Sequence, residues 1–540
     1  MDPRLRGDER GWGRLARRAL VALNVLAAAA LLLWTAAANG RPPVFTDTAY
    51  YFTLGEYASE LAGLVPGGEA RVAAADPSRI RHDGPGGRPS QASTIMGARA
   101  PSYALFLYGT QRLGGLWLTA ALQAWAMAWT VWLLARGVEP LRSLAAFWAL
   151  SAALAATSTL PYVTSFAMPD VFGGVTAAGI VALLVWWDRY GAGERAGLAA
   201  LLLFAFTTHG SHPAVALVMG GAGAVVLWLF GAGRGRALAR GGLVIGLALA
   251  SLAVGAAGEA WLDRAGSIPL LRPPFLTARL VADGSGRTYL HTACRDPAAK
   301  GGAAYRLCAH AREPLTNSEA ILWAENPRIG VFTPADYDER LALIGEQGRF
   351  VRGVLAYDPV GAAGSALRNW GLQLARAYVD DPLRNQAFFL RVRYWRRTSL
   401  PAIMPDPAPC RNRREGCRPL FRYTQVEVWT TGWALLAIAF VVGRLGSSGL
   451  PQALWRRRLG WSDPETRAMA AMAAIAAALL VNAAVCGVTS GPFPRYQARV
   501  VWLIPAAAVM TEFAVRRRAR ERRRAMARAR PTPPLVLGAG

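Results

Sequence analysis

Long apolar stretches separated by short polar segments dominate this chain. Ten stretches run for about 16–23 residues, and several windows of about 18–22 residues carry almost no charge, which is the length that an α-helix needs to cross a bilayer. The pattern predicts an all-α polytopic membrane protein with about ten transmembrane helices. The expected spans are residues 19–39, 116–135, 143–160, 171–187, 196–211, 213–231, 241–262, 425–443, 467–489 and 499–515.

Arginines between the spans predict the orientation. The segments that would share a side with the N-terminus all carry arginine, among them Arg456-Arg457-Arg458 and the tail from Arg516. The short loops on the other side, at 161–170, 209–213 and 490–499, carry at most two each. Because positively charged loops stay in the cytoplasm, we expect both termini to be cytoplasmic.

The expected spans divide the chain into four parts. Residues 1–262 form an N-terminal membrane module of seven spans, with an amphipathic helical pattern in a first outside loop at 40–115. Residues 263–424 form a large extracytoplasmic loop, 425–515 hold the last three spans, and 516–540 are a basic cytoplasmic tail.

Helical patterns also run through the large outside loop. They cover residues 318–325, 336–357 and 363–379. The last pattern has apolar residues at spacings of three and four, so it fits either the membrane surface or a place against the spans.

The basic composition does not indicate nucleic acid. Lys and Arg number 60 against 34 Asp and Glu, and Lys300 is the only lysine. These charges lie mainly in loops and tails around the spans, where membrane orientation and anionic lipid explain them. The expected partners are membrane lipids, and nucleic acid is not among them.

Four of the five cysteines lie in the large outside loop, where an oxidising compartment favours disulfides. The local pairs Cys294–Cys308 and Cys410–Cys417 are the favoured choice among three pairings. A zinc site is an alternative, because two histidines lie near Cys294 and Cys308 at suitable spacing. Unpaired thiols are a third.

An acid stands at the exit of the first span. Asp47 opens an amphipathic stretch in which Tyr50 and Tyr51 follow at once. A carboxylate beside membrane spans is costly and is usually functional. The alternative role is a helix N-cap.

Further polar residues fall on the same face. Arg99 precedes Pro101 and Tyr103 and has the geometry to clamp a phosphate; a contact with lipid headgroups is its alternative. Asp170 opens the fourth span, where a helix cap or a favourable helix-dipole contact is the alternative.

Two histidines and two arginines complete the set. His209 and His212 end the fifth span, where they would donate to a phosphate, help to bind a metal or serve a structural role. Arg495 and Arg499, four residues apart around Tyr496, would face one anion or snorkel to the membrane surface. Together the set supplies a base for a hydroxyl and cations for a phosphate.

These motifs resemble the GT-C superfamily of bacterial membrane glycosyltransferases. The resemblance lies in Asp47 with Tyr50 and Tyr51, in Arg99-Ala100-Pro101-Ser102-Tyr103, in Met168-Pro169-Asp170 and in Arg495-Tyr496. It covers roughly residues 15–260 and the later Arg-Tyr hairpin. Thr48 follows Asp47 where the best-known members have a second acid, so no metal ligand is assigned and a divalent metal stays an open alternative.

The resemblance implies inverting transfer of a sugar from a polyprenyl-phosphate donor to a glycan, lipid or protein acceptor. The reaction would take place at the outer face of the bacterial inner membrane. Asp47 would accept the proton of the acceptor, and Asp170 would be a second acid. The donor phosphate would be bound by Arg99, Arg495, Arg499, His209 and His212, and the substrates by Tyr50, Tyr51, Tyr103 and Tyr496.

Two other classes fit the same pattern of spans. A lipid or solute transporter predicts polar residues near the middle of several spans and helices broken there. A catalytically inactive membrane scaffold predicts no transfer at all.

Overall fold

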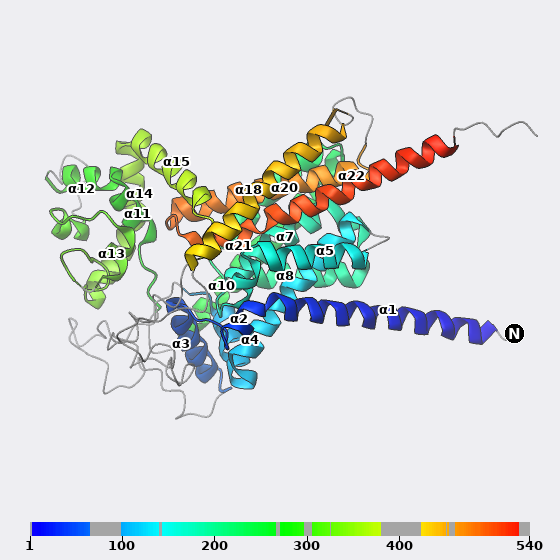
Figure 1. The fold of residues 1–540 in the computed structure, drawn as a ribbon. Coiled ribbons are helices and arrows are strands. Elements are labelled where there is room, and N and C mark those ends of the chain that lie inside the picture. The colour runs from blue at the N-terminus through cyan, green and yellow to red at the C-terminus, as the bar shows by residue number, and fades with distance from the viewer. Residues whose placement is uncertain are drawn as a thin grey trace, which may run out of the picture.

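Every regular element of the described residues is a helix. The computed structural model describes residues 3–64, 99–139, 143–265, 270–295, 305–324, 326–379, 423–449, 451–452 and 460–528. Figure 1 shows a bundle of long helices with a group of shorter helices at one end.

Seven helical segments of the described residues are long and apolar enough to cross a membrane, so the chain is a multi-pass membrane protein. They are α4 (Pro101–Val138), α7 (Asp170–Trp186) with the short turn after it, α9 (Ser211–Leu229), α10 (Arg234–Ala265), α18 (Tyr423–Ser448), α20 (Pro464–Thr489), and α21 (Pro494–Val501) with α22 (Leu503–Arg528).

The other three expected spans fall on different helices. Residues 19–39 lie on α1 (Pro3–Leu32) and the short α2 (Trp34–Ala38), and the remaining two spans lie on α5 (Ser143–Thr157) and α8 (Ala192–Thr207). Since α5 and α8 have only 15 and 16 residues, ten crossings remain a prediction.

Helix breaks separate short outer segments from the spans. In α4 the break falls at Gly114 and Gly115, and Gly115 has a φ of +68° that a glycine adopts without a steric penalty. The predicted span at 116–135 begins just after this break. Similarly, α21 starts with Pro494 in its first turn and is separated from α22 at Trp502.

Helix α7 lies at the centre of the bundle. Every residue from Asp170 to Trp186 is buried, and the helix packs against α4, α8, α9 and α20. A helix that is apolar on all sides is expected to be buried on all sides. Since Asp170 is its first residue, this acid is placed where the core of the bundle meets the outer end.

The short helices of the outside loop have an apolar core of their own. α11 (Phe275–Asp283), α12 (Ser285–Arg295), α13 (Ser318–Trp323) and α14 (Tyr337–Tyr357) pack around it. A disulfide joins Cys294 to Cys308, which removes both thiols from the zinc alternative. Cys410 and Cys417 lie outside the described residues.

Helix α15 (Pro359–Ala375) connects this group of helices to the bundle. Trp370 Nε1 donates to the carbonyl oxygen of Leu480 on α20 at 3.0 Å. Gln373 Nε2 donates to the carbonyl oxygen of Phe493, just before α21, at 2.8 Å. Of the two places that its sequence pattern fits, α15 therefore lies against the spans.

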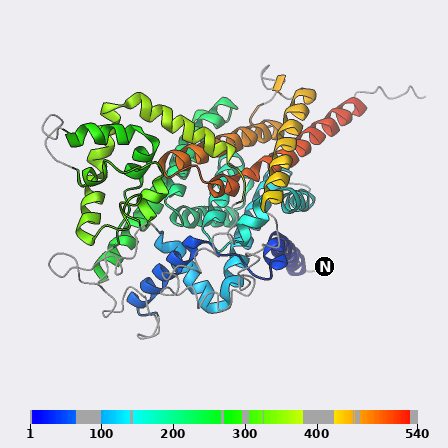
Figure 2. The same ribbon diagram turned by 60° about the vertical axis from the view of Figure 1, so that its left-hand side comes forward.

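The opposite end of the bundle holds the start of α1 and the end of α22. The start of α1 and the end of α22 lie away from α11–α14 in both views (Figures 1 and 2). At the inner end of α7, Asp188 binds Arg467 through both carboxylate oxygens, at 2.9 Å each, and Arg240 at 3.0 Å. These ion pairs connect α7, α10 and α20.

Candidate functional site

Asp47 lies in the first turn of α3 (Thr46–Leu61), at the end of the bundle away from the start of α1 (Figure 1). The Thr48 hydroxyl, not the Asp47 carboxylate, caps this helix: it accepts a hydrogen bond from Phe45 N at 2.8 Å. The same hydroxyl donates to the carbonyl oxygen of Ala167 at 3.0 Å, which fixes α3 to the turn before α7. Asp47 is thus not the N-cap, and its carboxylate faces other partners.

Two arginines from distant parts of the chain bind the Asp47 carboxylate. Arg99 Nη2 lies 2.6 Å from one oxygen and Arg495 Nη1 lies 2.9 Å from the other. Arg99 lies two residues before the start of α4, and Arg495 is the second residue of α21. The side chains of Asp47, Arg99 and Arg495 are 15%, 16% and 22% exposed, so the ion pairs are sheltered but still reach the surface.

Aromatic rings surround the two guanidinium groups. The Arg99 guanidinium lies 5.6 Å from the ring centroid of Tyr50 and 5.7 Å from that of Tyr51. The Arg495 guanidinium lies 5.2 Å from the ring of Tyr496. Cation–π contacts at these distances stabilise a charged arginine and restrict its position.

The four tyrosines of the predicted site differ in exposure. Tyr51, Tyr103 and Tyr496 are buried, whereas Tyr50 is half-buried. The Tyr103 hydroxyl donates to Gln123 Oε1 at 2.8 Å, and its ring lies 5.0 Å from that of Tyr51. Tyr103 therefore packs against Tyr51 in the interior, while Tyr50 keeps exposed surface next to Arg99.

The two arginines control the charge of Asp47. Burial by itself raises the pKa of Asp47, but the charges and hydrogen bonds of Arg99 and Arg495 outweigh burial and lower the pKa below its ordinary value of 3.8. Asp47 is thus ionised at neutral pH. A carboxylate held in this way is a weak base for as long as both arginines bind it.

A second ion pair lies deeper in the bundle. Arg499 Nη1 lies 3.7 Å from Asp170 Oδ1, and the Arg499 side chain is 0% exposed. Arg499 Nη2 donates to Asn482 Oδ1 at 3.0 Å and to Ser211 Oγ at 2.9 Å. Gly173 leaves the room for this side chain, because a Cβ there would lie 2.5 Å from Arg499 Cδ. Arg499 thus connects α21 to α7, α9 and α20 and does not reach the surface.

The two predicted histidines lie beside this buried pair. His212 is 1% exposed, and its Nδ1 lies 2.8 Å from the carbonyl oxygen of Ala205. His209 is half-buried, and its ring lies 5.3 Å from that of His212 and 6.1 Å from that of Tyr496. Of the two histidines, His209 is therefore the one whose ring packs against Tyr496.

Glu319 lies within electrostatic range of the same site, and no motif in the sequence marks it. Its side chain, on α13, is exposed, and its carboxylate interacts electrostatically with Arg495, Asp47 and Arg99. Crowding by neighbouring atoms raises the pKa of Glu319 above its ordinary value of 4.5, although the two arginines oppose this shift. Only the packing of the loop helices near the bundle brings the charge of this acid within electrostatic range of Asp47.

The described surroundings of Asp47 do not favour a divalent metal. The two guanidinium groups already supply positive charge there and would repel a second cation. Within the part of the chain that the structure describes, no three His, Cys, Asp or Glu side chains form a metal-binding group. No chemical step is therefore assigned to a metal.

The predicted polar residues converge at one end of the bundle in two layers. The surface layer holds Asp47, Arg99, Arg495, Tyr50 and His209, and the buried layer holds Asp170, Arg499, His212, Tyr51, Tyr103 and Tyr496. No protein-family model, curated protein or solved structure matches the chain. The chemistry of the site must therefore be argued from these residues.

Proposed function

We propose that this protein is a membrane glycosyltransferase that moves a sugar from a polyprenyl-phosphate donor to a hydroxyl acceptor at the outer face of the bacterial inner membrane. The observation that supports this function is the binding of one carboxylate, Asp47, by Arg99 at 2.6 Å and by Arg495 at 2.9 Å. A candidate base is thus in direct contact with two cations that suit a phosphate, at one end of the bundle.

The reaction needs each of these groups. The acceptor hydroxyl oxygen attacks the anomeric carbon of the donor sugar and forms a new C–O bond. The bond between that carbon and the phosphate oxygen breaks, and the polyprenyl phosphate leaves with the electron pair. Asp47 takes the hydroxyl proton, and Arg99 and Arg495 stabilise the negative charge that grows on the phosphate.

Donor binding also changes the basicity of Asp47 in this mechanism. A phosphate oxygen competes with the Asp47 carboxylate for the same N–H donors of Arg99 and Arg495. When the phosphate binds, the carboxylate loses part of the positive field that lowers its pKa. Asp47 is thus a weak base in the free protein and a stronger one once the donor is in place.

The Asp47→Asn variant tests this proposal. Asn keeps the shape of Asp but carries no charge and takes no proton, so we expect sugar transfer to fall by roughly a hundredfold to ten-thousandfold. Donor affinity should be equal to or higher than that of the wild type, because both arginines lose their competing carboxylate. Transfer of a radiolabelled sugar and equilibrium binding of the donor, in the same detergent, measure the two effects.

Two results would count against the mechanism. Transfer by Asp47→Asn at close to the wild-type rate would remove Asp47 as the base and move the search to Asp170. A tenfold loss of donor affinity in this variant would mean that Asp47 does not compete with the phosphate.

A transporter is the alternative from a different class. It predicts polar groups near the middle of the spans, and the structure holds buried polar residues at Asp170, Asn482 and Arg499. Asp170 and Arg499 lie at the starts of their spans, at the same end as Asp47, which favours a site at the membrane boundary. Uptake or flipping of a labelled lipid by proteoliposomes, without transfer, would support the transporter. A catalytically inactive scaffold would show neither activity.

A further inference from the structure

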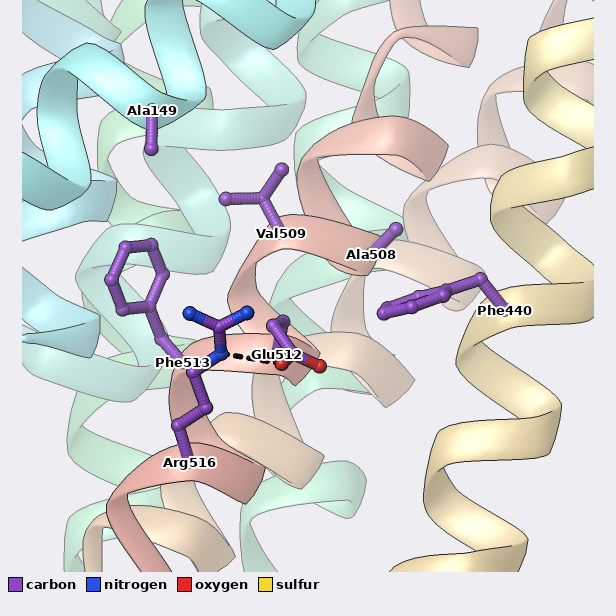
Figure 3. A pocket seen from close by; sticks show the side chains of 7 residues that line it. All are labelled: Ala149, Phe440, Ala508, Val509, Glu512, Phe513 and Arg516. Carbon is purple, nitrogen blue, oxygen red and sulfur yellow. Dashed lines mark hydrogen bonds and ion pairs between the residues drawn. The ribbon is translucent and has the colours of Figure 1, made fainter.

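A groove runs between three spans far from the Asp47 site. It has a volume of about 350 Å³ and lies between α5, α18 and α22. Figure 3 shows its lining side chains, which are Ala149, Phe440, Ala508, Val509, Glu512, Phe513 and Arg516. Five of these seven are apolar, and the two charged ones lie together on α22.

The groove is open on the side that would face the lipid, because several of its lining side chains are exposed there. Ala149 on α5 is exposed and Ala508 on α22 is half-buried, while Phe440 on α18 is 41% exposed. Helix α18 is the least buried of the seven candidate spans, with 22% of its apolar window buried. In a bilayer, the hydrocarbon of the lipid is the medium in contact with these side chains.

The polar end of the groove has an excess of positive charge. Arg444 Nε lies 2.8 Å and Arg516 Nε lies 2.5 Å from the two oxygens of Glu512. Two arginines thus share one carboxylate, and the terminal nitrogens of each guanidinium take no part in these two bonds. Arg444 and Arg516 are 36% and 64% exposed, so both are accessible to a headgroup.

We propose that this groove binds an anionic phospholipid from the leaflet next to the chain termini. One acyl chain lies along Phe440, Val509 and Phe513, and the phosphate accepts hydrogen bonds from Arg444 and Arg516.

Other occupants fit the groove less well. A helix from a second copy of the chain is ~10 Å wide, which is too wide for a groove walled by two alanines and three larger apolar side chains. The sugar donor is also a lipid phosphate, but its phosphate must lie at Asp47, at the opposite end of the bundle. A membrane phospholipid is the occupant whose charged end and apolar chain match the groove in this direction.

Native mass spectrometry of the full chain from mixed micelles tests the inference, with phosphatidylglycerol and phosphatidylcholine as probes. We expect the wild type to retain phosphatidylglycerol in preference to phosphatidylcholine. The double variant Arg444→Gln/Arg516→Gln should reduce this preference by roughly fivefold to thirtyfold, since each arginine near an anionic surface contributes about 1 kcal/mol. Ala508→Phe should reduce retention of both lipids, because its ring fills the groove.

Val428→Phe is the matched control for the added ring, because Val428 lies on the exposed face of α18 and is 74% exposed. Arg520→Gln is the control for the lost charge, since Arg520 is exposed beyond the groove on α22. Both controls should retain phosphatidylglycerol as the wild type does. Equal retention by all variants, an equal loss in the controls, or a dimer in place of a lipid adduct would each overturn the inference. None of these readouts depends on sugar transfer.

Discussion

At the scale of single residues, the ion pairs of Asp47 determine what the site can do. Without Arg99 and Arg495, a carboxylate so sheltered would have a raised pKa and would bind a proton more readily. With them it is charged, and the pKa of Asp47 is lowered. Its reactivity is therefore set by whatever occupies the two arginines.

Asp47 should also make stability depend on pH in the acid range. Because its folded pKa lies below the ordinary value of 3.8, its ion pairs contribute stability that is fully present above that value and is lost as the pH falls through the folded pKa. At pH 6 we expect Asp47→Asn to be less stable than the wild type by roughly 1–3 kcal/mol. The two melting temperatures should differ by a constant amount from pH 6 to about pH 4 and converge at lower pH, as Asp47 takes up its proton; a constant difference down to pH 2 would contradict the ion-pair account.

The two arginines should carry most of the affinity for the donor phosphate. Hydrogen bonds to a charged group contribute about 1.5–3 kcal/mol each, so Arg99→Ala and Arg495→Ala should each weaken donor binding by roughly tenfold to a hundredfold. Binding of a labelled polyprenyl phosphate measures the effect.

Arg112→Ala is the matched control, because Arg112 is an exposed arginine on α4, the helix that follows Arg99. If all three variants bind the donor equally, Arg99 and Arg495 hold only Asp47, and His209 becomes the next candidate for the phosphate.

At the scale of secondary structure, close packing of α3 on α4 positions Asp47 against Arg99. A Cβ on Gly55 of α3 would overlap the carbonyl oxygen of Ala104 on α4, so the two helices approach this closely only because residue 55 is glycine. The helix that carries the acid is thereby held against the one that follows the arginine.

Gly55→Ala should therefore separate the acid from its partner. Overpacking of this kind costs about 1–3 kcal/mol, so we expect a lower melting temperature and at least a tenfold slower transfer. Gly109→Ala on α4 is the control, because its added Cβ meets no atom within 4 Å and alanine favours a helix. Equal behaviour of the two variants in melting and transfer assays would show that this contact does not position the site.

Helix α21 holds Arg495 in place against Asp47. Its backbone is fixed by the bond from Asn482 Nδ2 to the carbonyl oxygen of Tyr496, at 2.7 Å, and by that from Thr159 Oγ1 to the carbonyl oxygen of Ala498, at 2.6 Å. Arg499, one turn after Arg495, is fully buried among polar partners. We therefore assign Arg499 and Asp170 to the positioning of α21, and Arg495 to the contact with the phosphate.

At the scale of the whole molecule, the Asp47 site lies at one end of the bundle, and the start of α1 and the end of α22 lie at the other. The arginine pattern predicts that the termini are cytoplasmic, so the site should face outward. Cysteine introduced at Arg328, on the exposed surface of the outside helices, should react with an impermeant reagent in intact cells.

Cysteine introduced at Ser447, exposed near the end of α18, should react only after the membrane is opened. The unsubstituted chain gives the background from its native cysteines. Equal labelling of both positions in intact cells would contradict the orientation and, with it, an outward site.

The sequence by itself determined the class of fold, because length and hydropathy decide which segments can cross a bilayer. It also predicted which polar residues gather at one end of the bundle, since charged groups beside apolar spans are costly and few. Helical patterns in the outside loop and the local Cys294–Cys308 pair were readable for the same reason: both depend on short-range spacing.

Only the tertiary structure decided how these residues divide between surface and interior. Arg495 and Arg499 look alike in sequence, four residues apart, yet one reaches Asp47 and the other is enclosed by α7, α9 and α20. No sequence motif marks Glu319, and its electrostatic interaction with the site depends on the packing of the loop helices near the bundle. Contacts between segments hundreds of residues apart depend on packing, and hydropathy and local spacing do not encode such contacts.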